Sequence, residues 1–252
     1  MTADMLIGKS IRKGYGGLEI LHGIDLSLAP GKITAILGPS GGGKSTLLRT
    51  LSILDAPDSG SVEVDGVEYS FPIKRKNGIQ PPWPKLTVVF QQLFLWPHLT
   101  LRRNITLPLE KLRAKSDGAS KEASDEVDEL LTLFEMSEHA DRYPNDVSLG
   151  QRQRAAFIRA VVLHPKYLLL DEITSALDVE HVSKILEHLK SLRDRGTGIL
   201  LVTHLIGFAK SAADHIIFME NGRIIASGDK SLLTTPKNER LVRFLSLVET
   251  AL

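Results

Sequence analysis

Short apolar runs alternate with turn residues over the first third of the chain, which is typical of β-structure. Residues 19–28 and 61–69 have the composition of strands, and the second run contains Asp65-Gly66, which suits the positive backbone angles of a tight hairpin turn. Between them, residues 32–37 form an apolar run leading into a glycine cluster, and residues 44–54 carry apolar side chains at helical spacing. We therefore predict antiparallel strands at residues 19–28 and 61–69. Between them we predict a strand at residues 32–37, a glycine loop, and a helix at residues 44–54.

The pattern becomes helical from residue 99 to residue 163 and then returns to strands. Residues 167–171 and 198–203 are apolar without polar alternation, which is typical of parallel strands covered on both faces. The helices predicted in this part are residues 121–135, with an apolar stripe at Val127, Leu130, Leu131 and Phe134, and residues 151–164, 180–193 and 238–248. A second hairpin, residues 215–219 and 223–227, is predicted to turn at Asn221-Gly222.

Composition and charge exclude several classes of protein. A chain of 252 residues, 42% of them apolar, can bury a large core without disulfides, and the absence of cysteine excludes cysteine-based catalysis. With 31 Lys+Arg against 30 Asp+Glu, the chain lacks the strong basic field of a dedicated nucleic-acid binder. No stretch approaches the roughly 20 apolar residues of a membrane span, so we expect a cytoplasmic protein.

A phosphate-binding loop is the strongest chemical signal. Residues 38–46, the phosphate loop, satisfy G-x-x-x-x-G-K-[ST] between a predicted strand and a predicted helix. Glycines let successive N–H groups point at phosphate oxygens, and the helix adds its positive N-terminal end. We expect Lys44 to reach the β and γ phosphates and Ser45 to place its hydroxyl on magnesium. The other expected nucleotide contacts of this loop are Gly38, Pro39, Ser40, Gly41, Gly42, Gly43 and Thr46.

Two neighbouring carboxylates follow a buried strand. Asp171 ends the run YLLLD and Glu172 comes next, at the edge where open α/β sheets bind ligands. Because side chains alternate in direction along a strand, the two carboxylates can contact different atoms of a bound ligand. We expect Asp171 to take magnesium and Glu172 to orient and deprotonate the attacking water. Without the phosphate loop, a solvated strand end would be the better interpretation.

Together these residues resemble the nucleotide-binding subunit of an ATP-binding cassette (ABC) transporter. Tyr15 resembles the aromatic that stacks on adenine, Gln91 the glutamine of the loop between catalytic core and helical insert, and His204 the switch histidine. Residues 148–151 (SLGQ) resemble the family's signature segment, and residues 175–178 (SALD) its dimer-contact loop. Taken singly, Tyr15 is typical of a surface turn and His204 of a core histidine. The resemblance rests on the number of these matches and on their order along the chain.

The resemblance implies an α/β fold: a P-loop NTPase core of the RecA type, an antiparallel β subdomain and an inserted helical subdomain. All 252 residues would form one ABC ATPase domain, with residues 1–92 and 161–252 as the catalytic core with its β subdomain and residues 93–160 as the helical insert. ATP and Mg²⁺ are the implied cofactors. The implied catalytic residues are Lys44, Gln91, Glu172 and His204, and the implied metal ligands are Ser45, Gln91 and Asp171.

The signature segment also has a physical interpretation. Ser148 precedes a predicted helix and is suited to cap it, and the free N–H groups of that helix end form an anion site. The family implies a homodimer that pairs head to tail, in which Ser148 of each copy caps the γ-phosphate held by Lys44 of the other. The remaining implied nucleotide contacts are Tyr15, Gln91, Gly150, Gln151 and Asp178.

Two positions depart from the family pattern. Leu149 replaces the first of two consecutive glycines, and we expect it to adopt an ordinary negative φ while Ser148 and the Gly150 N–H keep the phosphate contacts. Ile173 replaces the proline usual after the acidic pair, which frees one backbone N–H but removes no catalytic group.

Within the family, residues 51–60 and 171–180 make the chain most similar to the ATPase subunits of bacterial importers for polar amino acids. Such a subunit would be cytoplasmic and peripheral on the inner face of the membrane, where it binds integral permease subunits. A substrate-binding protein would be an indirect partner, acting through the permease. No nucleic-acid partner is expected. One alternative is a soluble ABC ATPase of repair, translation or cofactor assembly. Another is a P-loop enzyme outside the family, such as a small-molecule kinase, which would need neither residues 148–151 nor His204.

Two further segments have open interpretations. Residues 93–99 (LFLWPHL) would form either the groove that receives a short helix of the membrane partner or a buried stripe of the helical insert. Residues 71–85 combine prolines with basic residues and are predicted to be a surface loop.

Overall fold

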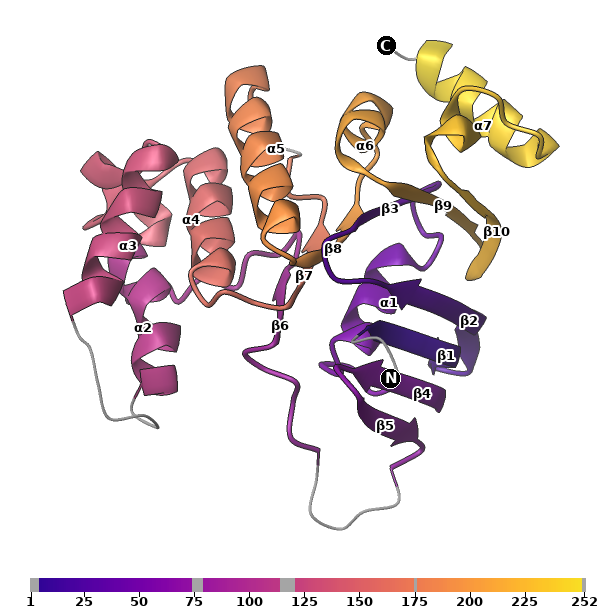
Figure 1. Ribbon diagram of the computed structural model, residues 1–252, viewed down its shortest axis with the longest axis horizontal. Coiled ribbons are helices and arrows are strands. Elements are labelled where there is room, and N and C mark those ends of the chain that lie inside the picture. The colour runs from indigo at the N-terminus through magenta and orange to yellow at the C-terminus, as the bar shows by residue number, and fades with distance from the viewer. Residues whose placement is uncertain (1–4, 74–78, 114–120, 175, 251–252) are drawn as a thin grey trace.

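The computed structural model describes residues 5–73, 79–113, 121–174 and 176–250, and Figure 1 shows their arrangement. Two sheets lie at its centre, a four-stranded sheet in the order β2-β1-β4-β5 and a six-stranded sheet in the order β10-β9-β3-β8-β7-β6. The strands are β1 (Leu6–Tyr15), β2 (Leu18–Leu28), β3 (Ile33–Leu37), β4 (Ser59–Val64), β5 (Val67–Phe71), β6 (Leu86–Val89), β7 (Tyr167–Asp171), β8 (Gly198–Val202), β9 (His215–Glu220) and β10 (Arg223–Gly228). The α-helices are α1 (Lys44–Leu51), α2 (Leu101–Arg113), α3 (Lys121–Leu133), α4 (Leu149–Val161), α5 (Val179–Asp194), α6 (Ile206–Ala212) and α7 (Glu239–Thr250).

The four-stranded sheet is antiparallel throughout, as the first third of the sequence predicts. Asp65 and Gly66 connect β4 to β5 with φ angles of 54° and 77°, the positive values that the hairpin requires. Strand β1 is not predicted by the sequence. Its pairing with β2 shifts register between Gly8 and Ile11, and this irregularity breaks the two-residue alternation by which a strand is recognised.

The six-stranded sheet contains the predicted parallel core. Strands β9, β3, β8, β7 and β6 run parallel, and β10 pairs antiparallel with β9. Alternate residues of each strand enter different cores: Leu168 and Leu170 pack with α4 and α5, whereas Tyr167 and Leu169 pack with α1 and the antiparallel sheet. Helices α1 and α4 therefore lie on opposite faces of this sheet, as Figure 1 shows.

Helices α2, α3 and α4 follow one another between β6 and β7, and their apolar faces join the core on one side of the six-stranded sheet. Phe134 and Phe157 form an edge-to-face pair there, with ring centroids 5.4 Å apart. The sequence predicts α3 and α4 but not α2, which contains Pro108. These layers confirm the predicted α/β class. Among the described residues, no helix is both long enough and apolar enough to cross a bilayer.

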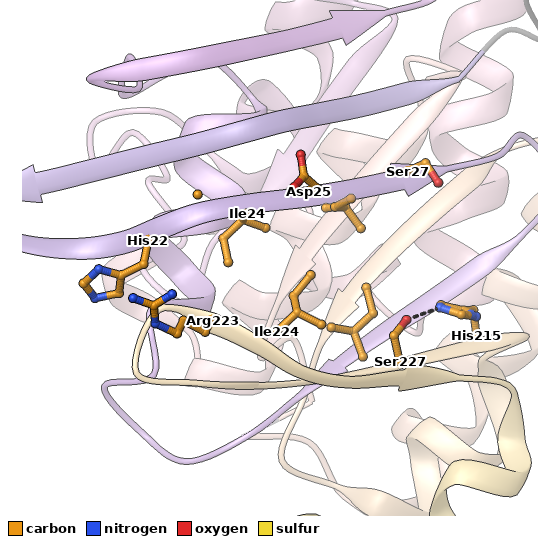
Figure 2. Close-up of a pocket in the computed structure, with 11 residues that line it drawn as sticks. His22, Ile24, Asp25, Ser27, His215, Arg223, Ile224 and Ser227 are labelled. Atoms are coloured by element: carbon orange, nitrogen blue, oxygen red, sulfur yellow. Dashed lines mark hydrogen bonds between the residues drawn. The ribbon is translucent and has the colours of Figure 1, made fainter. Parts of the chain in front are cut away.

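A groove of about 450 Å³ lies where the edges of the two sheets approach each other, between β2 and β10 (Figure 2). Ile24 and Ile224 point into it from the two strands, and a hydrogen bond of 2.7 Å joins His215 to Ser227 at one end. At the other end, the β9–β10 turn touches β2, because the His22 N–H donates to the Gly222 carbonyl at 3.0 Å. This turn also reaches the phosphate loop.

Candidate active site

The phosphate loop connects β3 to α1 and is shaped by the backbone of β9. Gly38 has a φ of 147°, and a Cβ at this position would lie 1.9 Å from the Met219 carbonyl oxygen. Only glycine fits such an approach. The Gly42 N–H donates to the Pro39 carbonyl at 3.2 Å, and its own carbonyl accepts from the Gly222 N–H at 3.1 Å. The loop is thus held by contacts within itself and by the β9–β10 hairpin.

Lys44 begins α1 and places its ammonium inside the loop. Its Nζ donates to the carbonyl oxygens of Gly38 at 2.9 Å and of Pro39 at 2.7 Å. Burial lowers the pKa of Lys44, while the carboxylates of Glu172 and Asp171 act in the opposite direction. A buried cation therefore stands between a cradle of backbone groups and two acids, which suits the binding of an anion.

Asp171 is the last residue of β7 and is only 3% exposed. Burial raises the pKa of its carboxyl group, and a hydrogen bond from the Ser45 hydroxyl partly offsets this rise. Its Oδ1 is buried without a hydrogen-bond partner. An unpartnered carboxylate oxygen beside a hydroxyl fits a hard divalent cation, which prefers oxygen ligands. Within the described residues, no group of three or more His, Asp or Glu could hold a metal by itself, so such a cation would take further ligands from phosphate and water.

Glu172 lies at the meeting point of three segments. The Gln91 side-chain amide donates to its Oε2 at 3.2 Å, and His204 Nδ1 lies 3.9 Å from its Oε1. Its backbone has a φ of 50°, and its N–H donates to the Val202 carbonyl at 3.0 Å. A non-glycine residue in this conformation is strained, and such strain is found at functional sites. The side chain of His204 is 56% exposed, so the interpretation as a core histidine is wrong.

The signature segment has the predicted capping geometry. Ser148 is the N-cap of α4: its Oγ accepts from the Gln151 N–H at 3.2 Å, and its own N–H donates to Gln151 Oε1 at 2.8 Å. Leu149 begins the helix with a negative φ, which confirms the backbone angle expected there. Gly150 lies against the dimer-contact loop, since a Cβ there would come within 2.9 Å of the Ala176 carbonyl oxygen. Ser175 lies outside the described residues, and Asp178 caps α5.

The structure thus brings the predicted site residues together in two groups. Lys44, Ser45, Gln91, Asp171, Glu172 and His204 gather at the carboxyl ends of the parallel strands. Ser148, Gly150, Gln151 and Asp178 gather where α4 meets the start of α5. Helices α4 and α1 lie on opposite faces of the sheet, so the second group begins a helix on the face opposite α1 (Figure 1).

Tyr15 stands apart at the end of β1, with its hydroxyl bonded to the carboxylate of Asp55. Burial and this hydrogen bond raise the pKa of Tyr15 to about 12. Asp55 also pairs with Lys13 at 2.7 Å, and Asp58 accepts from the Gly14 N–H at 2.7 Å. Sequence reasoning missed Asp55 and Asp58 as partners of this segment, because no spacing rule relates positions 40 or more residues apart.

Residues 93–99 form part of a groove. Phe94 is 58% and Trp96 is 37% exposed, whereas Leu93 and Leu95 pack partly against the core. The Arg159 guanidinium donates to the carbonyls of Phe94 at 2.8 Å and Leu93 at 2.7 Å. The open space, about 570 Å³, is lined mainly by apolar side chains, among them Leu54, Trp83, Phe90, Phe94, Trp96 and Leu163. Of the predicted surface loop, residues 74–78 lie outside the described residues.

Comparisons with known proteins agree with this geometry. A family model described as ABC transporter matches residues 21–175. The chain is 39% identical to the glutamine transport ATP-binding protein GlnQ of Escherichia coli K12, over 97% of this chain and 100% of that protein. It is also 39% identical to the glutamate transport ATP-binding protein GluA of Corynebacterium glutamicum, over 94% and 96% of the two chains. A dimeric ATP-binding cassette in a post-hydrolysis state with ADP and Pi superposes with a TM-score of 0.78 at 31% identity, over 89% of this chain and 98% of that one.

Proposed function

This chain belongs to the ABC transporter family of ATPases, and from that premise we propose that it is the ATP-hydrolysing subunit of an importer for polar amino acids. The observation that supports this most directly is the cluster of Gln91, Glu172 and His204 beside the phosphate loop. The substrate class follows from relatives whose names specify glutamine and glutamate transport and which align over nearly their whole length.

The residues of this site have different roles in ATP hydrolysis. The phosphate loop and Lys44 bind the β and γ phosphates. Ser45, Asp171 and Gln91 would hold Mg²⁺, which when bound supplies positive charge to the phosphate oxygens. Glu172 accepts a proton from the attacking water on its carboxylate. Gln91 and His204 lie on either side of that carboxylate and orient it.

A second copy of the chain completes the nucleotide site. Gly150 and the capped start of α4 present backbone N–H groups, which suit an anion, yet they lie on the sheet face opposite α1. A head-to-tail pair places the signature segment of one copy over the phosphate loop of the other, and gives two equivalent sites. The dimeric cassette with ADP and Pi supports pairing of two copies. Tyr15 would then stack on the adenine, and Asp178 would face the partner.

The groove beside Trp96 is the proposed docking site for a short helix of the permease. Its exposed aromatic side chains suit a helix-in-groove contact. Arg159 and Asn104 hold the segment that lines it, since the Trp96 N–H donates to Asn104 Oδ1 at 2.7 Å. Gln91, at the other end of this segment, contacts Glu172. A helix seated in the groove can therefore influence the hydrolytic residues.

Single-cysteine crosslinking tests the proposal sharply, because the chain contains no cysteine of its own. A Trp96→Cys variant is co-expressed with a candidate permease subunit that carries one cysteine in a cytoplasmic loop. We expect a disulfide-linked product whose yield changes with Mg·ATP. Leu18→Cys, at a position 67% exposed on β2, is the matched control and should not crosslink. Equal yields at both positions, or none at Trp96, would contradict docking.

The substrate class needs a separate measurement. In the assembled importer, ATP hydrolysis should rise when the substrate-binding protein is loaded with glutamine, glutamate or arginine. Loading with a sugar or a dipeptide is the control. Stimulation by these ligands instead of the amino acids would leave the ATPase assignment standing and overturn the amino-acid assignment.

A further inference from the structure

We propose that His181 is a positioning residue that joins α4 to the dimer-contact loop, so that the two segments facing the second copy keep a fixed relative position. The inference rests on the proposed function, because it assigns both segments to the interface of the head-to-tail pair. Nothing in the phosphate chemistry itself involves His181.

The His181 ring is bonded at both nitrogens. Its Nδ1 lies 2.7 Å from Oδ1 of Asp178, and its Nε2 contacts the guanidinium of Arg154 on α4. Because a guanidinium can only donate, Nε2 must accept, and the ring hydrogen must lie on Nδ1, where it is donated to Asp178. The geometry therefore describes a neutral imidazole that links a carboxylate of one segment to a guanidinium of the other.

Asp178 and Arg154, the two partners of the ring, are each held in place by a further hydrogen bond. Asp178 Oδ1 also accepts from the His181 N–H at 2.9 Å, which makes Asp178 the N-cap of α5 and sets the end of the dimer-contact loop. Arg154 is 7% exposed and donates to the Phe134 carbonyl at 3.1 Å, which fixes its guanidinium within the helical layer. The side chain of His181 is itself only 16% exposed.

A second contact shows that the two segments meet closely. Gly150 of the signature segment packs against the carbonyl of Ala176 in the dimer-contact loop. Helices α4 and α5 stand side by side in Figure 1, and the Arg154–His181 contact joins them about one turn beyond this approach. Tight packing at Gly150 limits the distance between the segments, and the imidazole limits their rotation about that point.

Three charged groups contact the ring: Asp178 on α5, Arg154 on α4, and Glu135 after α3, whose Oε2 lies 3.4 Å from Nε2. Lys184 on α5 pairs with Glu135. Removal of the ring would therefore take away the group that joins Asp178 to Arg154, and the link between α4 and the dimer-contact loop should weaken.

The test measures ATP-driven pairing in the full chain, in a Glu172→Gln background that slows hydrolysis. The fraction of dimer is followed by light scattering at saturating Mg·ATP and neutral pH. The variants are His181→Leu, which removes both links, and His181→Gln, whose amide oxygen keeps an acceptor for Arg154. His215→Leu is the matched control, since the His215 side chain bonds Ser227 on the edge strand β10, away from α4 and α5.

We expect His181→Leu to weaken dimerisation by about tenfold at neutral pH, the size of one charge-assisted hydrogen bond, with nucleotide affinity of the monomer unchanged. His181→Gln should pair nearly as well as the parent, and His215→Leu should behave as the parent. Unchanged pairing of His181→Leu, an equal loss in His181→Gln, or a parallel loss of monomer nucleotide affinity would overturn the proposal. If His181→Leu does not fold, His181→Asn, whose shorter amide cannot reach Arg154, replaces it, and pairing equal to that of His181→Gln overturns the proposal. Failure of the parent Glu172→Gln protein to pair with ATP would instead overturn the head-to-tail dimer, and with it this role.

Discussion

The side-chain amide of Gln91 donates to the carboxylate of Glu172 over 3.2 Å, which connects the segment after β6 to the end of β7. The same segment continues into the groove at Phe94 and Trp96. We assign Glu172 to the attacking water. A movement of the groove therefore reaches Glu172 through the hydrogen bond from Gln91 and a few residues of backbone.

Glu172→Gln should leave nucleotide binding intact and lower the rate of ATP hydrolysis by roughly a factor of 100 to 10,000, because the amide cannot accept the proton from water. Phosphate release measures the rate, and equilibrium binding of a fluorescent ATP analogue measures affinity. Glu68→Gln, which neutralises an exposed carboxylate on β5, is the control and should hydrolyse at the normal rate. Hydrolysis retained in Glu172→Gln would exclude Glu172 as the base.

Asp171→Asn should make the nucleotide-free protein more stable and weaken its affinity for magnesium. Burial raises the pKa of Asp171, so the folded chain holds this proton more tightly than the unfolded chain, and stability falls as the pH rises through the two pKa values. At neutral pH the ionised carboxylate therefore destabilises the fold, and removing its charge should raise the melting temperature of the nucleotide-free protein.

The same substitution removes the negative charge and one of the two oxygens of the carboxylate assigned to the cation. The Mg²⁺ concentration for half-maximal hydrolysis should rise by about tenfold or more, while binding of ATP in EDTA should be preserved. Calorimetric melting without nucleotide and magnesium titrations of hydrolysis check the two effects. A lower melting temperature together with an unchanged magnesium requirement would contradict both assignments.

Local signals made the first group of site residues predictable. A buried strand leads into the nine residues of the phosphate loop, which contain the glycine cluster and the helix start. Asp171 and Glu172 follow the apolar run YLLL, whose composition indicates a buried strand. The carboxyl ends of parallel strands meet at one edge, so topology alone brings these segments together. The predicted role of Ser148 as a helix cap was likewise local, since it bonds a residue three positions on.

Contacts between distant segments were not predictable in this way. His181 meets Arg154 across 27 residues, and Tyr15 meets Asp55 across 40, and neither pair has a spacing that a single sequence reveals. The missed elements have related causes. Register shifts interrupt the alternation of β1, and Pro108 lies inside α2. Strand β6 has only 4 residues and α6 only 7, too few for a clear period.

The carboxylate of Asp55 should contribute a measurable part of the acid sensitivity. Burial opposes its ionisation, but hydrogen bonds from Lys13 and Tyr15 outweigh burial and hold the pKa of Asp55 below its usual value. A lowered folded pKa stabilises the protein above the unfolded pKa of about 3.9, and this contribution is lost as the pH falls through the folded pKa. Asp55→Asn should therefore lose less stability than the parent between about pH 5 and 3.

Urea unfolding at several pH values measures this difference, and Asp125→Asn, which removes an exposed carboxylate on α3, serves as the control. The same substitution bears on Tyr15, whose hydroxyl exchanges a charged carboxylate acceptor for a neutral amide oxygen in Asp55→Asn. If Asp55 positions the Tyr15 ring for adenine, the affinity for ATP should fall by a few fold in Asp55→Asn and remain normal in Asp125→Asn. Equal acid slopes in the parent and Asp55→Asn would refute the pairing.

The two hairpin turns provide a matched pair for testing how the phosphate loop is held. Asn221-Gly222 and Asp65-Gly66 both have positive φ at each residue, with 68° at Gly222 and 77° at Gly66. Alanine at either glycine adopts an unfavourable backbone conformation, which is worth about 1 kcal/mol of stability. The surroundings differ: a Cβ at Gly66 meets nothing within 4 Å, whereas a Cβ at Gly222 would lie 1.9 Å from the Ile20 carbonyl oxygen.

Gly66→Ala should therefore lower the free energy of unfolding by about 1 kcal/mol and leave ATP affinity unchanged. Gly222→Ala should lower it by about 2 to 4 kcal/mol, because backbone must move to relieve the overlap. The displaced turn also carries the N–H that donates to Gly42, so the phosphate loop should lose a support and bind ATP several-fold more weakly. Urea unfolding and nucleotide titration of both variants check this pair of outcomes. If the two variants lose equal stability and both bind ATP normally, the β9–β10 turn does not hold the phosphate loop.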